Sequence, residues 1–177
     1  MRHSVGTGCR RIEVPVSKQA YREAMARLGA AVNVITTDGP GGRAGFTASA
    51  VCSVTDTPPT LLVCANRTND SYAAFKANGV LCVNVLTHGQ QEVSGIFAGL
   101  TEHTMQGRFD SAHWHTLATG APVLDEDAVS FDCRITQTVE VGTHDVFFCE
   151  VEAVETGKIH EGLIYYGRGY HRVGVNE

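Results

Sequence analysis

Two long stretches in the C-terminal half alternate apolar and polar residues. Between residues 129 and 141 the apolar side chains stand at odd positions, whereas Asp132 and other polar residues stand at even ones. Residues 146–154 repeat this alternation. Because successive side chains of a strand point to opposite faces of a sheet, each stretch predicts a half-buried antiparallel strand. The connection 142–145 begins with glycine, so we expect the two strands to form a long hairpin.

The N-terminal half contains shorter patterns. Ser17 suits an N-cap, and apolar residues at spacings of three and four after it predict a helix that ends at Gly29. The glycine-rich segment 38–42 predicts a turn, and the two prolines at 58 and 59 end a connection. Apolar runs predict four strands, over 32–37, 46–55, 60–65 and 80–86. Short helices are predicted over 70–77, 90–97 and, from a weaker pattern, 105–109.

Many antiparallel strands with few helices indicate a mainly β (α+β) architecture, either a small barrel or a sandwich with helices over its openings. The chain has 177 residues, which suits one domain, and we place it over residues 17–177. Residues 1–16 include three arginines but lack the apolar stretch of a secretory signal. They are interpreted as a flexible tail, with organellar targeting as the alternative.

Charge and hydropathy narrow the classes of partner. The 14 basic and 19 acidic residues give a formal net charge of −5, which is unfavourable for generic binding to nucleic acid or to an anionic membrane. Uninterrupted apolar runs are far shorter than the roughly 20 residues of a membrane-spanning helix. We therefore expect neither nucleic acid nor a membrane as a partner.

The six cysteines indicate the redox compartment. They form no Cys-x-x-Cys pair and no zinc-type spacing, and five of them stand in apolar, strand-like runs. Free cysteine in such a run behaves as a small apolar side chain. Buried thiols in a reducing cytoplasm are favoured over a set of disulfides.

Three apparent motifs are set aside. Residues 39–44 match a dinucleotide-binding fingerprint only superficially, because a strand and not a helix is predicted to follow. His113-Trp114-His115 has no third ligand at a suitable spacing, so a surface loop is favoured over a metal site. Cys149 and His144 could be a nucleophile and its base, but a cysteine that alternates toward the core is more often structural.

Residues 45–53 are unusually small for a strand. Packing alone favours large β-branched side chains, whereas this segment contains mainly glycine, alanine, serine and threonine. Small side chains expose backbone N–H and C=O groups, and Thr47 and Ser49 add hydroxyls, which together suit a planar heterocycle. Close packing of the first helix on this strand explains the composition equally well.

Residues 66–71 follow a predicted buried strand and are rich in polar groups. Arg67 offers a fork suited to phosphate, while Thr68 and Ser71 offer hydroxyls near the start of a predicted helix, where free N–H groups attract anions. An ordinary N-cap accounts for Thr68 or Asn69 just as well.

An ordered series of blocks between residues 17 and 172 resembles the short-chain flavin reductases, the reductase components of two-component flavin monooxygenases. The runs 36–40 and 57–64 look closest to the FMN reductases of uracil degradation, and the corrin reductases of cobalamin synthesis are similar enough to stay in consideration. The blocks are 29–32, 45–50, 58–60, 82–86, 97–99, Trp114, 120–124, 142–144 and 170–171.

The resemblance implies a split β-barrel, usually a homodimer, with FMN in a groove where the barrel meets its partner subunit. It implies hydride transfer from NADH to FMN, with reduced flavin passed to an oxygenase. The alternatives that remain are reduction of a cobalt corrinoid and non-enzymatic binding of FMN.

The resemblance also implies roles for particular residues. His144 would position the nicotinamide, and Tyr170 would cover the flavin or the nicotinamide. The ring of FMN would lie along Thr47, Ala48, Ser49 and Ala50. The ribityl chain and phosphate would be held by Asn66, Arg67 and Ser71, and the same cleft would be lined by Asn84 and Phe97. No metal is expected.

Overall fold

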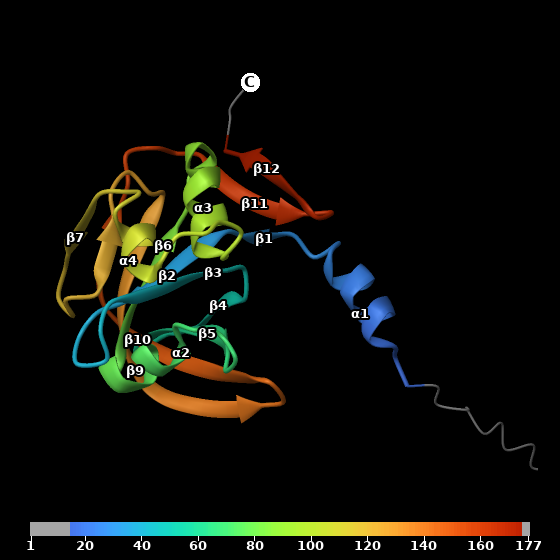
Figure 1. The fold of residues 1–177 in the computed structure, drawn as a ribbon, viewed down its shortest axis with the longest axis horizontal. Coiled ribbons are helices and arrows are strands. Elements are labelled where there is room, and N and C mark those ends of the chain that lie inside the picture. The colour runs from blue at the N-terminus through green and yellow to red at the C-terminus, as the bar shows by residue number, and fades with distance from the viewer. Residues whose placement is uncertain (1–14, 175–177) are drawn as a thin grey trace, which may run out of the picture.

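The computed structural model describes residues 15–174, and most of their regular secondary structure is antiparallel strand (Figure 1). In chain order the elements are α1 (Lys18–Met25), β1 (Ala30–Ala31), β2 (Asn33–Thr37), β3 (Ala44–Ala48), β4 (Val51–Asp56), β5 (Pro59–Asn66), α2 (Tyr72–Asn78), β6 (Val80–Val85), a 3-10 turn (His88–Gln90), α3 (Gln91–Phe97), α4 (Met105–Phe109), β7 (Trp114–Thr116), β8 (Pro122–Leu124), β9 (Val129–Val141), β10 (His144–Thr156), β11 (Gly162–Tyr166) and β12 (Gly169–Val173). The mainly β architecture is confirmed. Residues 1–14 of the predicted tail lie outside the described residues.

One seven-stranded sheet, in the order β3-β2-β6-β9-β10-β5-β4, forms the body of the molecule. Its two edge strands, β3 and β4, are consecutive in the chain and are separated only by Ser49 and Ala50. The prediction of a single strand over 46–55 is therefore wrong. At Ser49 the chain leaves its partner β2 and joins β5, so that Thr47 pairs with Val34 whereas Val51 pairs with Val63.

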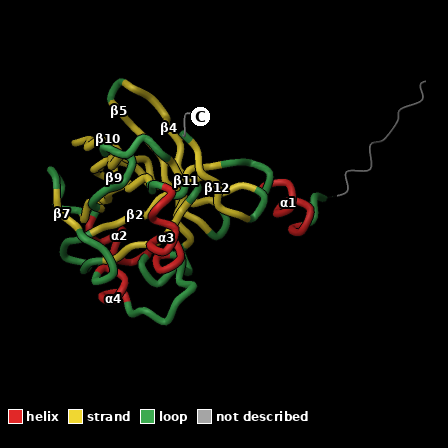
Figure 2. Tube along the Cα trace, turned by 90° about the horizontal axis from the view of Figure 1, so that it is seen from above, coloured by secondary structure: helices red, strands yellow, loops and turns green. Residues whose placement is uncertain are grey.

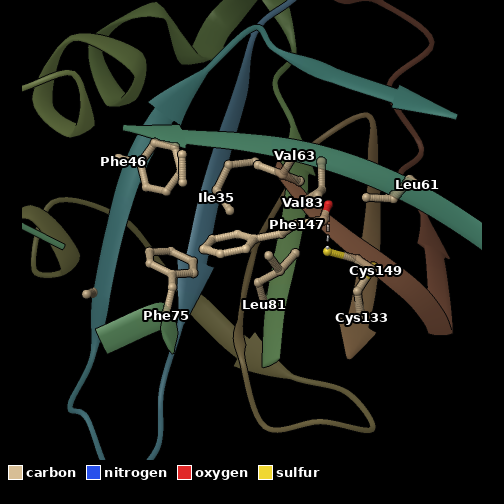
Figure 3. Close-up of a cluster of buried hydrophobic side chains, with 12 residues drawn as sticks. Ile35, Phe46, Leu61, Val63, Phe75, Leu81, Val83, Cys133, Phe147 and Cys149 are labelled. Carbon is tan, nitrogen blue, oxygen red and sulfur yellow. Dashed lines mark hydrogen bonds between the residues drawn. The ribbon is translucent and has the colours of Figure 1, made fainter. Parts of the chain in front are cut away.

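The main core is a cluster of buried side chains that come from the strands of this sheet and from α2 (Figure 3). Phe46 meets Phe75 edge to face, with 5.2 Å between the ring centroids, and Phe147 lies beside them. The cluster is completed by aliphatic side chains and by the thiols of Cys133 and Cys149. Its fully buried members include Ile35, Val63, Phe75, Leu81, Val83 and Phe147.

The five cysteines of the described segment are all free thiols. Cys82, Cys133 and Cys149 are buried, as expected from the apolar runs around them. The expectation is wrong for two others, because Cys52 is exposed and Cys64 is half-buried. Cys52 belongs to β4 and Cys64 to β5, and within residues 15–174 no further layer covers the outer faces of these strands.

The predicted hairpin is present as β9 and β10, with Val141 opposite His144 and a tight turn at Gly142-Thr143. Its alternation is broken at Asp132, which was expected on the polar face but is fully buried. Asp132 accepts hydrogen bonds from the backbone N–H of Thr119, at 2.7 Å, and from the Thr119 hydroxyl. The segment before β8 covers this part of the sheet, and the strand pattern alone gives no sign of that layer.

A second apolar cluster lies under α3 and α4. Phe97 contacts Phe109 edge to face and packs on Trp114, whose indole Nε1 donates to the Phe109 carbonyl at 2.9 Å. Gly45 of β3 makes room for this packing, because a Cβ there would lie 2.8 Å from the Phe97 ring. The short pair β7-β8 and the three-stranded sheet β1-β11-β12 border the cluster, and none of these five strands was predicted.

Helix α1 projects from the body of the molecule (Figures 1 and 2). The predicted N-cap is confirmed, since the Ser17 hydroxyl accepts from the N–H of Ala20 at 3.1 Å. The helix ends at Met25 and not at Gly29, and its residues are not buried. Its apolar side chains face outward, with Leu28 just beyond it 63% exposed. Within one chain, the alternative that this helix packs on the small-residue strand is therefore not realised.

Candidate functional site

Two adjoining hollows meet where β3 gives way to β4, and together they are called the junction groove. The smaller has a volume of about 240 Å³ and is lined by Thr47, Ala48, Ser49, Ser94, Tyr170 and four apolar or aromatic neighbours. The larger has a volume of about 880 Å³ and extends from Ser49 and Ala50 along β4 and β5 to the base of α1. Ser49 and Tyr165 line both hollows, so the four small residues predicted at 47–50 stand along one continuous groove.

The floor of the junction groove is built from small residues at the edge of a sheet. β3 is an edge strand, so backbone N–H and C=O groups on its outer side have no strand partner. The Thr47 hydroxyl donates its proton to the Ser94 carbonyl at 2.7 Å, so toward a ligand it is left with acceptor capacity only. The Ser94 hydroxyl in turn lies 2.9 Å from the hydroxyl of Tyr170. This chain of hydrogen bonds fixes β3, α3 and β12 around the groove.

Two tyrosines from the β11–β12 hairpin form one wall. Tyr170, predicted to cover a cofactor, lies directly opposite Tyr165 in the strand register. Their ring centroids are 5.6 Å apart, and both line the smaller hollow. The sequence analysis missed Tyr165. The apolar run 163–166 followed by Gly167-Arg168-Gly169 would have predicted a hairpin that sets the two rings side by side.

Asn66 and His144 form a second group at one end of the same sheet face. They are cross-strand partners at the end of β5 and the start of β10. Cys64 lines the larger hollow and stands two residues before Asn66 on the same face of β5. The Asn66–His144 pair therefore lies about 7 Å from Cys64 along the strand. The Asn66 side-chain oxygen accepts from the N–H and the hydroxyl of Thr68, each at 3.0 Å. His144 Nδ1 lies 2.9 Å from the Thr143 hydroxyl.

Arg67 lies close to this pair, but its guanidinium is already occupied. It forms an ion pair with Glu140 and donates to the Gly142 carbonyl, and its Nη1 is 3.7 Å from Asp145. The hydrogen bond to Glu140 is the main reason that the pKa of Arg67 is raised. The same carboxylate of Asp145 accepts from the Tyr72 hydroxyl at 2.6 Å. The guanidinium therefore holds the turn of the β9–β10 hairpin.

Three of the predicted site residues lie inside the protein and do not line the groove: Ser71, Asn84 and Phe97. Asn84 is 0% exposed, and its amide donates to the Val34 carbonyl at 2.9 Å while its oxygen accepts from the N–H of Leu124 at 2.7 Å. The Ser71 hydroxyl donates to Asn69 at 2.8 Å. The expectation that Asn84 and Phe97 line the cleft is wrong, because these side chains have no surface that a ligand could reach.

The structure shows the surroundings of the motifs that were set aside. Cys149 is fully buried, and burial raises its pKa to about 12, so the thiol is protonated and no nucleophile. His115 lies between Asp125, at 2.7 Å, and Glu155, at 3.1 Å. Across residues 15–174, no group of three histidine, cysteine or acidic side chains is arranged to hold a metal ion. The turn at 39–42 leads into β3 and not into a helix. No helix within this span is long and apolar enough to cross a bilayer.

A model of the family described as "Flavin reductase like domain" matches residues 25–174. This chain belongs to the flavin reductase-like family. The match begins at the last residue of α1 and includes every strand, so the junction groove and the Asn66–His144 pair both fall inside the flavin reductase-like domain.

Individual relatives agree with this assignment. "FMN reductase (NADH) RutF" of Ancylobacter novellus is 60% identical over 158 residues, which cover 89% of this chain and 86% of the relative. Flavin reductase PheA2 has the same fold, with a TM-score of 0.81 and 26% identity over 89% of this chain and 99% of the other. The NADH:FAD oxidoreductase SgcE6 of Streptomyces globisporus, solved in complex with NAD and FAD fragments, also has this fold. Its TM-score is 0.80, and it is 26% identical over 89% of this chain and 93% of the other. The split-barrel expectation is confirmed.

Proposed function

We propose that this chain is an NADH-dependent FMN reductase, an oxidoreductase that transfers a hydride from NADH to FMN. The observation that carries the proposal is the Ancylobacter novellus relative, whose name states this activity and whose sequence is 60% identical over 89% of this chain. At that level of identity the two proteins are similar over a whole domain, and the similarity is not limited to one short motif. The fold family alone would support flavin reduction but not the choice of FMN and NADH.

The residues of the junction groove fit a flavin. The two hollows, of about 880 and 240 Å³, are of the size that holds a small-molecule cofactor. Their floor is the edge of β3, where small side chains leave unpaired backbone donors and acceptors for the polar rim of a planar ring. Tyr165 and Tyr170 offer an aromatic wall. Thr47, Ala48, Ser49 and Ala50 would thus lie along the ring of FMN.

FMN, when bound, supplies a ring that accepts a hydride, so the protein has only to orient the two reactants and to exclude water. Thr47 holds the groove floor in place through its hydrogen bond to α3. His144 stands on the same sheet face, where its imidazole would position the nicotinamide. No acid–base pair is needed, which agrees with the protonated, buried thiol of Cys149.

A second copy of the chain would complete the groove. The outer face of the sheet is apolar across three neighbouring strands, β5, β10 and β9. Val146 of β10 pairs with Cys64 of β5 on one side and with Val139 of β9 on the other, so the three side chains lie side by side on this face. Val141 on the same face is 58% exposed, and the apolar side chains of α1 are exposed as well. Surfaces of this kind on a monomer mark an interface. A homodimer formed through them would close the larger hollow, which lies between α1 and β5.

Reduced FMN would leave the groove for a flavin-dependent oxygenase, and the resemblance favours an oxygenase of uracil degradation. The groove is open to solvent and lined mainly by apolar surface, which suits a flavin that binds and dissociates. We place the enzyme in the cytoplasm, where the free thiols of its sheet stay reduced.

The proposal is tested by comparing acceptors in an anaerobic NADH oxidation assay. Purified protein with NADH should reduce free FMN in a saturable manner and should reduce a cobalt(II) corrinoid only when FMN is also present. Direct, faster reduction of the corrinoid would support the cobalamin alternative. Stoichiometric binding of FMN without NADH oxidation would show a binding module and contradict the proposal.

A further inference from the structure

Two arginines face the larger hollow of the junction groove. Among the described residues that line it, Arg22 of α1 and Arg168 at the tip of the β11–β12 hairpin are the only charged side chains, and none is acidic. This contrasts with the whole chain, whose formal net charge is −5. A hollow of about 880 Å³ with two cations and otherwise mainly apolar walls is suited to a ligand that carries negative charge.

The fold brings the two arginines to one corner of the hollow. The backbone N–H of Gly167 donates to the Ala26 carbonyl at 2.7 Å, which joins the hairpin tip to the end of α1 (Figure 1). Arg22 stands four residues before Ala26, and side chains at this spacing lie on the same side of a helix, about 6 Å apart. Arg168 follows Gly167 directly in the turn. Both guanidiniums therefore belong to the place where α1 meets the hairpin, called the α1 corner.

Neither guanidinium at the α1 corner is neutralised by the described part of the chain. No ion pair within residues 15–174 involves Arg22 or Arg168. By comparison, Arg134 and Arg172 are each paired with a glutamate. Two like charges at one corner repel each other, and the repulsion would grow if a second copy closed the hollow and excluded water. An anion between the two guanidiniums would remove this repulsion.

The backbone at Arg168 gives an independent indication. The hairpin turns through only two residues, Gly167 and Arg168, whose φ angles are 59° and 66°. Glycine, asparagine and aspartate suit such positions, whereas the Cβ of arginine makes the left-handed conformation unfavourable. The turn itself therefore gives no reason for an arginine here. A guanidinium that binds a ligand in the hollow does give one.

The proposed reaction narrows the choice of anion. With the ring of FMN along residues 47–50, the part of the larger hollow that reaches α1 stays open for the second reactant. NADH carries a diphosphate, whose two linked phosphates can each accept hydrogen bonds from one guanidinium. FMN carries a single phosphate. Two separate arginines at one corner therefore fit the dinucleotide better than the flavin.

We infer that Arg22 and Arg168 together bind the diphosphate of NADH at the α1 corner. The inference rests on the proposed function, because it takes NADH as the second ligand of the junction groove. The two arginines are binding residues and take no part in hydride transfer itself. They add affinity for the dinucleotide, while the rest of the groove positions the dihydronicotinamide on the flavin.

Equilibrium binding gives the first test, because NAD⁺ does not react with oxidised FMN. When NAD⁺ is titrated calorimetrically into FMN-saturated protein, its dissociation constant should rise at least about fivefold in Arg22→Gln and in Arg168→Gln, since each variant loses a charge-assisted hydrogen bond. The dissociation constant of FMN, from flavin fluorescence, should change less than about twofold. Arg27→Gln is the matched control, because Arg27 follows α1 but does not line the hollow, and it should change neither constant.

A hydride donor without phosphate gives the second test. Dihydronicotinamide riboside has the nicotinamide and ribose of NADH but no diphosphate. Arg22→Gln and Arg168→Gln should raise the KM for NADH at least about fivefold and change kcat less than about twofold. Neither variant should change kcat/KM for the riboside by more than about twofold, because this donor has no group for the α1 corner to bind.

Arg168→Gly separates binding from folding. Glycine relieves the left-handed backbone at position 168, so the melting temperature of this variant should equal or exceed that of the unmodified protein. Its affinity for NAD⁺ should nevertheless fall as in Arg168→Gln. Inorganic pyrophosphate should raise the melting temperature of the unmodified protein and should have less effect on Arg168→Gly.

The inference is overturned if both glutamine variants bind NAD⁺ as tightly as the unmodified protein does. Weakened FMN binding with unchanged NAD⁺ binding would also overturn it, because the α1 corner would then hold the flavin phosphate. Equal losses with NADH and with the riboside would show a structural role, and conversion of a dimer to a monomer would show a contact with the second copy. Absence of NADH oxidation by the unmodified protein with FMN would contradict the proposed function, whereas failure of this inference alone would leave that reaction intact.

Discussion

At the scale of single residues, the polar side chains differ in whether their hydrogen-bonding atoms are already used. Asn84 and Ser71 are satisfied inside the fold, and Arg67 is occupied at a hairpin turn. The sequence could not separate these from His144, because an asparagine in a strand or a serine before a helix suits a ligand and the backbone equally well. The hydrogen-bond partners that the fold supplies, near in sequence for Ser71 and distant for Asn84, decide which groups remain free.

Replacing His144 tests the role assigned to it. His144→Ala should raise the KM for NADH about three- to tenfold, the range of one lost hydrogen bond, and should leave the dissociation constant of FMN unchanged within about twofold. Steady-state kinetics and flavin fluorescence measure the two quantities separately. His160, an exposed histidine in the loop before β11, offers the control His160→Ala, which should affect neither. Equal weakening of NADH and FMN would show that His144 does not act on the nicotinamide.

Asp127 predicts a pH dependence of stability. It is 3% exposed and accepts from the Ser130 hydroxyl, and burial raises its pKa from 3.8 to about 6. Between these two values the folded state holds more protons than the unfolded state, so the free energy of unfolding falls as the pH rises through this window. Asp127→Asn removes the titration. The variant should therefore gain about 3 kcal/mol relative to the unmodified protein between about pH 4 and pH 7.

Denaturant unfolding at a series of pH values measures this difference. Asp110→Asn, a change at an exposed aspartate, should show no such trend. A constant difference between Asp127→Asn and the unmodified protein across the series would contradict the raised pKa.

At the scale of elements, the quality of prediction follows the range of the interactions that fix each element. The β9–β10 hairpin and helix α4 were predicted closely, because alternation and helical spacing are local properties. The β3–β4 boundary was not, because Ser49 and Ala50 mark a change of partner strand that leaves the apolar pattern unbroken. The small residues at 45–50 were identified correctly as unusual, although Gly45 serves packing against Phe97 and only the later ones line the groove.

The outer face of β5, β9 and β10 predicts the oligomeric state. Val139→Asp combined with Val141→Asp places two charges on this face, and burying each would cost several kcal/mol, which is enough to dissociate a dimer at micromolar concentration. Size-exclusion chromatography with light scattering should show a dimer for the unmodified protein and a monomer for the double variant. Val154→Asp, at a similarly exposed valine of β10 opposite Phe131, is the control and should remain dimeric. A monomeric unmodified protein, or a dimeric double variant, would disprove this interface.

At the scale of the whole molecule, size and shape constrain how two cofactors can be used. Under the proposal, NADH and FMN meet in the junction groove, which lies within the flavin reductase-like match over residues 25–174. The junction groove is open and lies beside the apolar face at which a second copy would add a wall. The family could be identified from the order of its sequence blocks. The location of the junction groove, where β3 gives way to β4, could be found only from the fold.

The central claim is that the protein reduces free FMN repeatedly with NADH. The most direct measurement is an anaerobic titration in which excess NADH is added to the protein with FMN at many equivalents per chain, and the loss of the oxidised flavin absorbance is followed. The account predicts that all of the FMN is bleached, at a rate that saturates with FMN and depends on protein concentration. Bleaching that stops at one equivalent per chain, or that does not exceed the rate without protein, would contradict it.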